Sequence, residues 1–551
     1  MIQLPSERFA GEYKGVKNMG NNTSRIAALT LTLPLIAAAF TGCGADDLTS
    51  GNYQPPAEHR TYSDETEAAG SHNTDSFPGN EEYKAVVESG FKDPKTEPLS
   101  TFSADVDTAS YTNARRMLSG HKKVDPDSVR VEEYINYFDY KYADPEEGKV
   151  FGEYVELTDC PWNPETKLMM IGIQGKRIPE DELPPSNLVF LIDSSGSMGA
   201  YNKLPLVQQA FSLLADQLTE RDRISIVTYA GSSEVLLEGA SGDDKDEVIS
   251  KLNSIMASGG TNGEGGIENA YRLAEEYFIE GGNNRIILAT DGDLNIGKCS
   301  EEELTALIEE KREGGVYLSV LGFGTGNIKD NKMEALADNG NGNYSYIDSV
   351  DEAKRVLVEE MGGTLFTIAK DVKIQVEFNP ATVSSYRLVG YDNRLMEAED
   401  FYDDSRDAGE VGAGHSVTVL YEVGLNEKSG TVNGTYHDIP LEFAEEHTSE
   451  PASSGGRSEL IKLSVAYKDI GTDEENYSSN LYGMEKYDPE PTQGIMLAGA
   501  AAEFAMLLKD SDYKGDSSFE YIIKTAKQIS GGNEKIDELR KLAEAAAALY
   551  R

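Results

Sequence analysis

The sequence predicts an α/β protein whose doubly wound, mainly parallel sheet follows a small N-terminal helical region and precedes a C-terminal β-rich domain that ends in helices. Apolar strands alternate with helical patterns from residue 186 to 366, which is typical of a parallel sheet covered on both faces. The segment LVFLI at 188–192 is apolar without alternation, as expected for a buried strand. After residue 369, segments such as DVKIQVEF and HSVTVLYEV alternate in part, which indicates an all-β module.

The first 43 residues are predicted to be a lipoprotein signal peptide. An apolar stretch at 26–40 follows several basic residues, and its length suits a signal-peptide core but is short for a membrane span. It ends in FTGCG, which resembles a bacterial lipobox and implies that Cys43 is lipidated. The expected location is extracytoplasmic, with the lipid in the cell membrane or the outer membrane. A plain secretory signal with an incidental cysteine is the alternative.

The next two regions differ in composition. Residues 44–98 are acidic, rich in Gly, Ser, Thr, Asn and Pro, and poor in apolar side chains, which predicts a disordered tether. Residues 99–185 form the N-terminal region, with helix-like spacing at 108–119 and 126–138 and strand-like segments at 151–175.

The central domain, residues 186–366, is divided by its apolar patterns. Strands are predicted at 188–192, 223–229, 285–290, 316–324 and 344–347, with a hairpin strand at 234–239. Helices are predicted near 204–218, 244–256, 265–279, 301–313, 331–338 and 350–366. The C-terminal domain, residues 367–551, begins with strands and ends with a helical tail that includes QGIMLAGAAAEFAMLLK and EKIDELRKLAEAAAALY.

Oxygen-bearing side chains gather where predicted strands end. The loop DSSGS carries Asp193, Ser195 and Ser197, a Gly-rich turn carries Thr261, and Asp291 directly follows another strand. Because the carboxyl ends of parallel strands share one edge, we expect these five side chains to converge. Hydroxyl and carboxylate oxygens suit Mg²⁺, or another hard cation such as Mn²⁺ or Ca²⁺, better than Zn²⁺.

This arrangement resembles the von Willebrand factor A (VWA) domain and its metal-ion-dependent adhesion site. The resemblance implies that Ser195 and Ser197 bind the ion directly, and that Thr261 joins them when a ligand is bound. It implies that Asp193 and Asp291 act largely through water, and that an Asp or Glu of a protein partner completes the shell of the ion. An inert polar loop, or a metal that is never used, is the alternative.

A longer part of the chain, roughly residues 98–424, resembles bacterial VWA lipoproteins with an N-terminal extension and an uncharacterised C-terminal domain. The segments DVDTASYTNARR, CPWNPETKL and YRLVGYDNR carry this resemblance. It implies a fold and a site, but neither a reaction nor a partner.

Charge and motifs narrow the function further. The 50 basic and 96 acidic residues give a net charge of −46, so phosphate backbones repel the chain and we expect no nucleic-acid partner. The segment SSGSMG lacks the first glycine of a nucleophile elbow, and we expect no enzyme.

The expected function is capture of a protein partner by a membrane-anchored protein. The alternative is an envelope assembly or scaffold factor in which the metal is only structural.

Two further cysteines leave a choice open. Outside the cytoplasm, Cys160 and Cys299 could form one disulfide. Two buried, unpaired thiols are the alternative.

Overall fold

The computed structural model describes the chain from residue 81 onward, with internal gaps. The described ranges are 81–261, 263–292, 301–403, 406, 408–426, 435–436, 439–442, 459–470, 472 and 474–551. The predicted signal peptide with Cys43, most of the predicted tether, and Cys299 lie outside them. None of the described helices combines the length and the apolar character that a membrane crossing requires.

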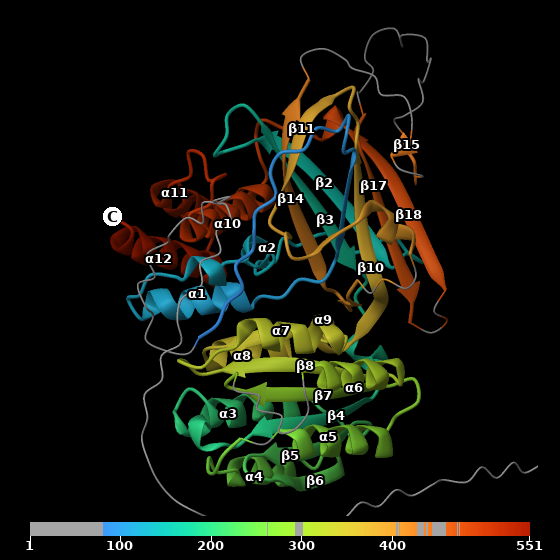
Figure 1. Ribbon diagram of the computed structural model, residues 1–551, viewed down its shortest axis with the longest axis vertical. Helices are drawn as coiled ribbons and strands as arrows, with labels where there is room; N and C mark the ends of the chain where they lie inside the picture. Colours follow the sequence, from blue (N-terminus) through green and yellow to red (C-terminus); the bar gives the residue numbers. More distant parts are fainter. Residues whose placement is uncertain are drawn as a thin grey trace, which may run out of the picture. The chain divides into compact units, whose positions relative to one another are not determined.

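Residues 186–366, called the α/β domain below, contain a six-stranded sheet (Figure 1). Its strand order is β6-β5-β4-β7-β8-β9, and all neighbours are parallel except the β5–β6 hairpin. The strands are β4 (Ser186–Asp193), β5 (Arg223–Tyr229), β6 (Ser233–Ser241), β7 (Asn283–Thr290), β8 (Val316–Phe323) and β9 (Tyr344–Ile347). All residues of β4 are buried, so the mainly parallel sheet predicted from its apolar pattern is confirmed.

Helices cover both faces of this sheet. They are α3 (Leu204–Ala215), α4 (Lys245–Ser254), α5 (Glu264–Glu276), α6 (Glu301–Glu313), α7 (Asp330–Asn339) and α8 (Val350–Lys354). Leu188, Phe190 and Ile192 of β4 share one core with α3, α4 and α8. Val189 and Leu191 of the same strand share another core with α5, α6 and α7. This split follows from the period of two along a strand and is the doubly wound arrangement.

The last helix of the α/β domain differs from the prediction. The sequence predicts one helix over 350–366, but the structure has α8, a π-helical turn at Arg355–Glu359, and α9 (Met361–Leu365). π-helical turns are rare in proteins, and those that occur often lie at functional sites. This turn carries Arg355, whose buried contacts are described below.

The α/β domain is inserted into a β-sandwich. One sheet has the order β12-β1-β10-β17-β18, with β13 paired to β10, and the other has the order β11-β14-β3-β2. Its strands are β1 (Leu99–Ser103), β2 (Phe151–Asp159), β3 (Lys167–Gly175), β10 (Thr367–Phe378), β11 (Val383–Val389), β12 (Leu395–Met396), β13 (Val411–Gly412), β14 (Ser416–Leu425), β17 (Glu459–Asp469) and β18 (Glu475–Gly483). A separate short hairpin joins β15 (Thr435–Tyr436) to β16 (Ile439–Pro440).

The two regions that the sequence analysis treated separately share this sandwich. Strand β1 pairs with β10, and β3 pairs with β14, both antiparallel. A two-stranded hairpin such as β2–β3 is marginal alone in water, so strands that precede the α/β domain gain their partners from strands that follow it.

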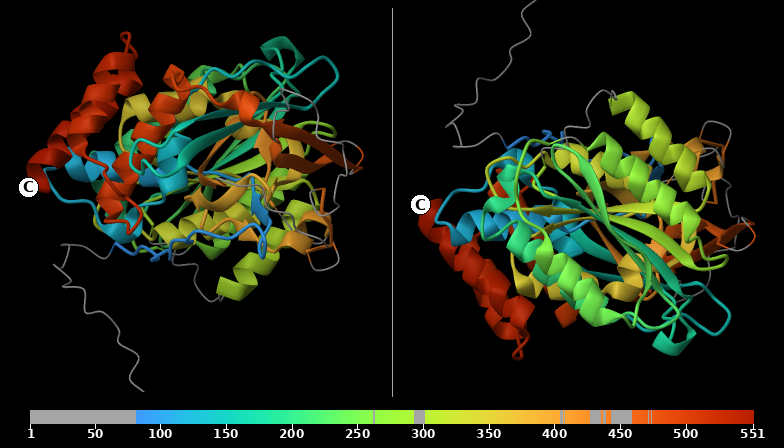
Figure 2. Two further views of the ribbon diagram at one scale, coloured as in Figure 1. Left: turned by 90° about the horizontal axis from the view of Figure 1, so that it is seen from above. Right: turned by 90° about the horizontal axis from the view of Figure 1, so that it is seen from below.

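A helical layer is shared in the same way. It consists of α1 (Ala109–Ser119), α2 (Val131–Ile135), α10 (Gln493–Lys509), α11 (Phe519–Ile529) and α12 (Glu534–Leu549). Tyr111, Tyr134, Phe504 and Ala543 belong to one buried core, and Figure 2 shows α1 beside the C-terminal helices in both views. The helix predicted at 108–119 is therefore present as α1. The segment predicted as helical at 126–138 forms a 3-10 turn, Pro126–Ser128, and the short α2, and both helices share their core with the C-terminal helices.

The end of the predicted tether is attached to the folded unit. Glu82 N–H donates to the Ile328 carbonyl at 2.9 Å, and the backbones of Lys92 and Tyr386 exchange hydrogen bonds of 2.8 and 3.0 Å. Glu81 forms an ion pair of 3.1 Å with Arg116. The folded unit therefore begins before residue 98, where the tether was predicted to end. Composition does not show this, because it does not reveal that an acidic side chain such as Glu81 has a basic partner.

Cys160 lies in the core of the helical layer. Within the described residues it has no disulfide partner, and burial raises the pKa of its thiol to about 12. Such a thiol is unreactive at neutral pH, which agrees with a structural role.

Candidate metal site

The predicted D-x-S-x-S loop begins where β4 ends. Asp193 is fully buried, and its Oδ1 accepts a hydrogen bond of 2.8 Å from the Ser195 N–H. Ser195 is also buried, whereas Ser197 is exposed in the short turn Gly196–Gly199. The Oγ atoms of the two serines lie 2.9 Å apart. The loop therefore presents paired hydroxyls above a buried carboxylate.

Backbone hydrogen bonds join this loop to the loop that carries Thr261. The Gly196 N–H donates to the Gly259 carbonyl at 3.1 Å, and the Ser258 N–H donates to the Ser194 carbonyl at 2.8 Å. A Cβ at position 196 would lie 3.2 Å from the Gly259 oxygen, so glycine permits this close approach. Thr261 itself is partly buried, two residues beyond Gly259.

Asp291 comes to the same edge on the neighbouring strand. Strands β4 and β7 are parallel, with Ile192 opposite Ala289, so Asp291 follows the end of β7 as the D-x-S-x-S loop follows β4. Asp291 is buried, and its Oδ2 accepts from the Nζ of Lys203 at 2.7 Å. Lys203 is not predicted from the sequence, because a lysine before an amphipathic helix is ordinarily exposed.

These donors fit a hard divalent cation. Neighbouring ligands of an octahedral ion with bonds of about 2.1 Å lie about 3 Å apart, and the Oγ atoms of Ser195 and Ser197 are 2.9 Å apart. Across the parts of the chain that the structure describes, no group of three or more His, Cys, Asp or Glu side chains is arranged to hold a metal. The described oxygen donors at this edge are hydroxyls as well as carboxylates. The assignment of Asp193, Ser195, Ser197, Thr261 and Asp291 as ligands of a cation stays a prediction.

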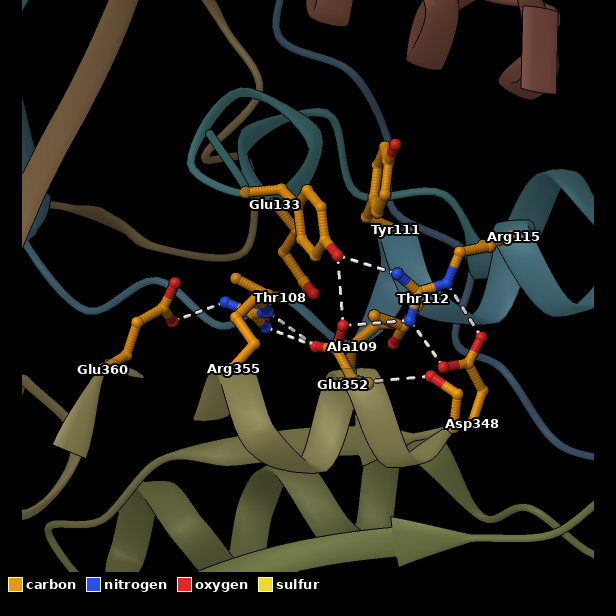
Figure 3. Close-up of polar contacts among 12 residues, drawn as sticks. Thr108, Ala109, Tyr111, Thr112, Arg115, Glu133, Asp348, Glu352, Arg355 and Glu360 are labelled. Atoms are coloured by element: carbon orange, nitrogen blue, oxygen red, sulfur yellow. Dashed lines mark hydrogen bonds and ion pairs between the residues drawn. The ribbon is translucent and has the colours of Figure 1, made fainter. Parts of the chain in front are cut away.

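A second polar cluster joins the α/β domain to α1 (Figure 3). Arg115 of α1 donates to Asp348 at 2.8 Å and pairs with Glu352 at 2.9 Å. Arg355 also pairs with Glu352 and donates to Thr108 Oγ1 at 3.0 Å. Burial raises the pKa of Glu352, but Arg355 and Arg115 outweigh it and lower that pKa to about 2. We call these side chains the Arg355 cluster; the sequence alone does not predict it.

A third cluster, the Arg394 cluster, surrounds one guanidinium with carboxylates. Arg394 contacts Asp105 at 3.0 Å, Asp107 at 3.2 Å, Glu334 at 3.2 Å and Asp338 at 2.9 Å. It links the sandwich to α7. Beside it lies a cavity of about 290 Å³.

Comparisons with known proteins agree with this architecture. Residues 187–359 match the von Willebrand factor type A domain, residues 78–170 match a family described as von Willebrand factor, and residues 363–549 match the C-terminal domain of the uncharacterised protein YfbK. YfbK of Escherichia coli is 40% identical over 461 residues, which cover 82% of this chain and 78% of YfbK. Human inter-alpha-trypsin inhibitor heavy chain H4 is 32% identical over 165 residues, which cover 28% of this chain and 18% of that protein.

Solved structures show similarity as well. A von Willebrand factor type A protein from Catenulispora acidiphila is 14% identical with a TM-score of 0.41, and the match covers 73% of this chain and 91% of that one. Proximal thread matrix protein 1 from the mussel byssus, with a zinc-occupied metal-ion-dependent adhesion site, is 24% identical with a TM-score of 0.27; the match covers 32% of this chain and 45% of that one. By its extended match to YfbK, the chain belongs to the family of bacterial VWA-domain proteins that carry the YfbK C-terminal domain.

Proposed function

We propose that this chain is a lipid-anchored, extracytoplasmic protein that captures a protein partner through a divalent cation at the carboxyl edge of its α/β domain. VWA-domain proteins mediate protein–protein interactions, some of them through such a cation. The observation that carries the proposal is the 2.9 Å separation of the Ser195 and Ser197 hydroxyls, beside the buried carboxylate of Asp193.

Exposure of the site favours capture of a partner over a purely structural ion. Ser197 is exposed while Asp193 and Ser195 are buried, so the donors that hold the ion are anchored and one side of the site faces solvent. A bound Mg²⁺ would supply a positive centre there that accepts an Asp or Glu carboxylate of the partner. The segment SSGSMG lacks the first glycine of a nucleophile elbow, so we propose binding without catalysis.

The surroundings of the site suit a protein. Tyr201 is 87% exposed on the loop after Ser197, and Met256 is 80% exposed on the loop before Thr261. Single exposed apolar side chains are common, but these two flank one site on two loops joined by hydrogen bonds. Tyr and Met are enriched at protein interfaces, and their position here supports a protein partner.

The proposal is tested by capture from envelope extracts on the mature chain, with Mg²⁺ or with a chelator. Asp193→Ala is the test variant, and Asp246→Ala, which removes an exposed carboxylate from the same domain, is its matched control. We expect a protein that is retained by the wild type and the control with Mg²⁺ and is lost with the chelator or with Asp193→Ala. Capture that is the same with Mg²⁺ and with the chelator, and the same for the wild type and Asp193→Ala, would contradict the proposal.

The alternative is an envelope scaffold in which the ion only stabilises the fold. The ion pair between Lys203 and Asp291 favours it, since one carboxylate of the site already has a cation. This version predicts that Mg²⁺ raises the melting temperature and that no metal-dependent partner is captured.

A further inference from the structure

We propose that Lys203 sets the cation affinity of this site: its ammonium group is a resident counter-ion of Asp291, with which a divalent cation has to compete. The inference rests on the proposed cation site and adds a residue that controls when the site is filled.

The ion pair is buried on both sides. The Nζ of Lys203 lies 2.7 Å from Oδ2 of Asp291, and the two side chains are 9% and 0% exposed. A lysine that only covers a surface keeps its ammonium in water. Here the ammonium lies at the carboxyl edge of the sheet, where the D-x-S-x-S loop follows β4 and Asp291 follows β7.

The backbone of Lys203 is fixed at the start of α3. Its N–H donates to the Ala200 carbonyl at 3.0 Å, and its carbonyl accepts from the Leu206 and Val207 N–H groups at 2.8 and 2.9 Å. The same short loop carries Ser197 at its beginning and Lys203 at its end. One loop therefore supplies both a hydroxyl donor for an ion and the competing ammonium.

A third strand end makes room for the lysine stem. Gly324 directly follows β8, and its φ is +81°. A Cβ at this position would lie 2.3 Å from Cε and 2.5 Å from Cγ of Lys203. The stem of Lys203 therefore passes over Gly324, where any side chain would collide with it. The segments that follow β4, β7 and β8 supply Lys203, Asp291 and Gly324 in turn.

The charges give Lys203 its effect. The carboxylates of Asp193 and Asp291 together would neutralise the charge of a divalent ion. The ammonium of Lys203, however, already neutralises the charge of Asp291. Like charges in a partly dehydrated site repel strongly, so Lys203 lowers the affinity for the ion. An ion that binds nevertheless keeps more uncompensated positive charge, which a partner's carboxylate can neutralise. Binding of the ion and of the acid then support each other, and this coupling is reciprocal.

The test measures Mn²⁺ binding to the mature chain by titration calorimetry. The variants Lys203→Met and Lys203→Gln keep the stem and remove the charge, and we expect each to bind Mn²⁺ at least about tenfold more tightly than the wild type. Lys311→Met is the matched control, because Lys311 pairs with exposed Glu275 on another helix at 2.7 Å; we expect it to bind as the wild type does. Adding Asp193→Ala to each variant should abolish binding.

The outcomes separate this inference from the proposed function. Mn²⁺ affinity that is equal or weaker in both neutral variants, with unchanged circular dichroism, would overturn the role of Lys203 and leave the proposed site standing. Absence of binding in the wild type and in every variant would overturn both. Tight binding that survives Asp193→Ala would place the ion elsewhere and also overturn both.

Discussion

Buried charge in the α/β domain is balanced in different ways in two clusters. In the Arg355 cluster, Glu352 contacts both Arg115 and Arg355, so arginines of the chain itself neutralise the acid (Figure 3). At the carboxyl edge of the sheet, the lysine that meets Asp291 comes from the loop that also presents Ser197. The first arrangement is complete and joins two parts of the fold. The second places hard oxygen donors beside the ammonium of Lys203, with which we propose that a divalent cation competes.

The Arg394 cluster shows a third way of balancing charge. One guanidinium faces the carboxylates of Asp105, Asp107, Glu334 and Asp338. Burial and the neighbouring Asp105 raise the pKa of Asp107 well above its ordinary value. One arginine here faces four carboxylates, so the ionised form of Asp107 is disfavoured, whereas in the Arg355 cluster two arginines face Glu352.

The largest expected effect comes from breaking the complete cluster. Arg355→Met leaves Glu352 and its neighbours buried without this partner, and such a loss costs about 3–5 kcal/mol of unfolding free energy. The control is Arg272→Met, which breaks an exposed pair with Glu276 and should cost less than about 1 kcal/mol. Urea denaturation measures both. Equal losses would show that the Arg355 cluster does not hold the parts together.

The proposed cation site should respond to an added ion, which the Arg355 cluster has no need of. Mg²⁺ at about one hundred times its Kd should stabilise the wild type by about 2.7 kcal/mol, and Ser195→Ala with Ser197→Ala should remove this gain. Thermal unfolding with Mg²⁺ and with a chelator measures the difference. A double variant that keeps the full gain would exclude these hydroxyls as ligands.

The Arg394 cluster should respond to pH. Because folding raises the pKa of Asp107, the folded state binds more protons than the unfolded state above the ordinary value of 3.8. This contribution to stability is complete at acidic pH and is lost as pH rises, with a slope of at most about 1.4 kcal/mol per pH unit. Asp107→Asn, which keeps an acceptor for the Tyr344 N–H at 2.8 Å, should flatten that slope. Urea midpoints between about pH 5 and 8 compare the two proteins, and parallel pH profiles would refute this origin.

Local patterns in the sequence predicted the α/β domain well. The strands at 223–229 and 344–347 and the helix at 301–313 have the predicted bounds, because each is a short segment with a clear apolar period. The pairing of Phe102 with Ile374 leaves no such signal, since strand partners distant in sequence are chosen by tertiary contacts. The burial of Lys203 and Arg394 was not predicted for a related reason. A charged residue is expected to be exposed unless it is paired, and the partners of these two are distant in the sequence.

The smallest effect on stability is expected at the apolar rim of the cation site. Tyr201→Ser and Met256→Ser change exposed side chains, so each should alter the unfolding free energy by less than about 0.5 kcal/mol and leave Mn²⁺ binding unchanged. Capture of the Mg²⁺-dependent partner should nevertheless weaken, because the rim and the ion face the same surface. Phe278→Ser, at an exposed position of the same domain, should leave capture as it is. If the rim variants capture as the wild type does, recognition depends on the ion and its acid alone.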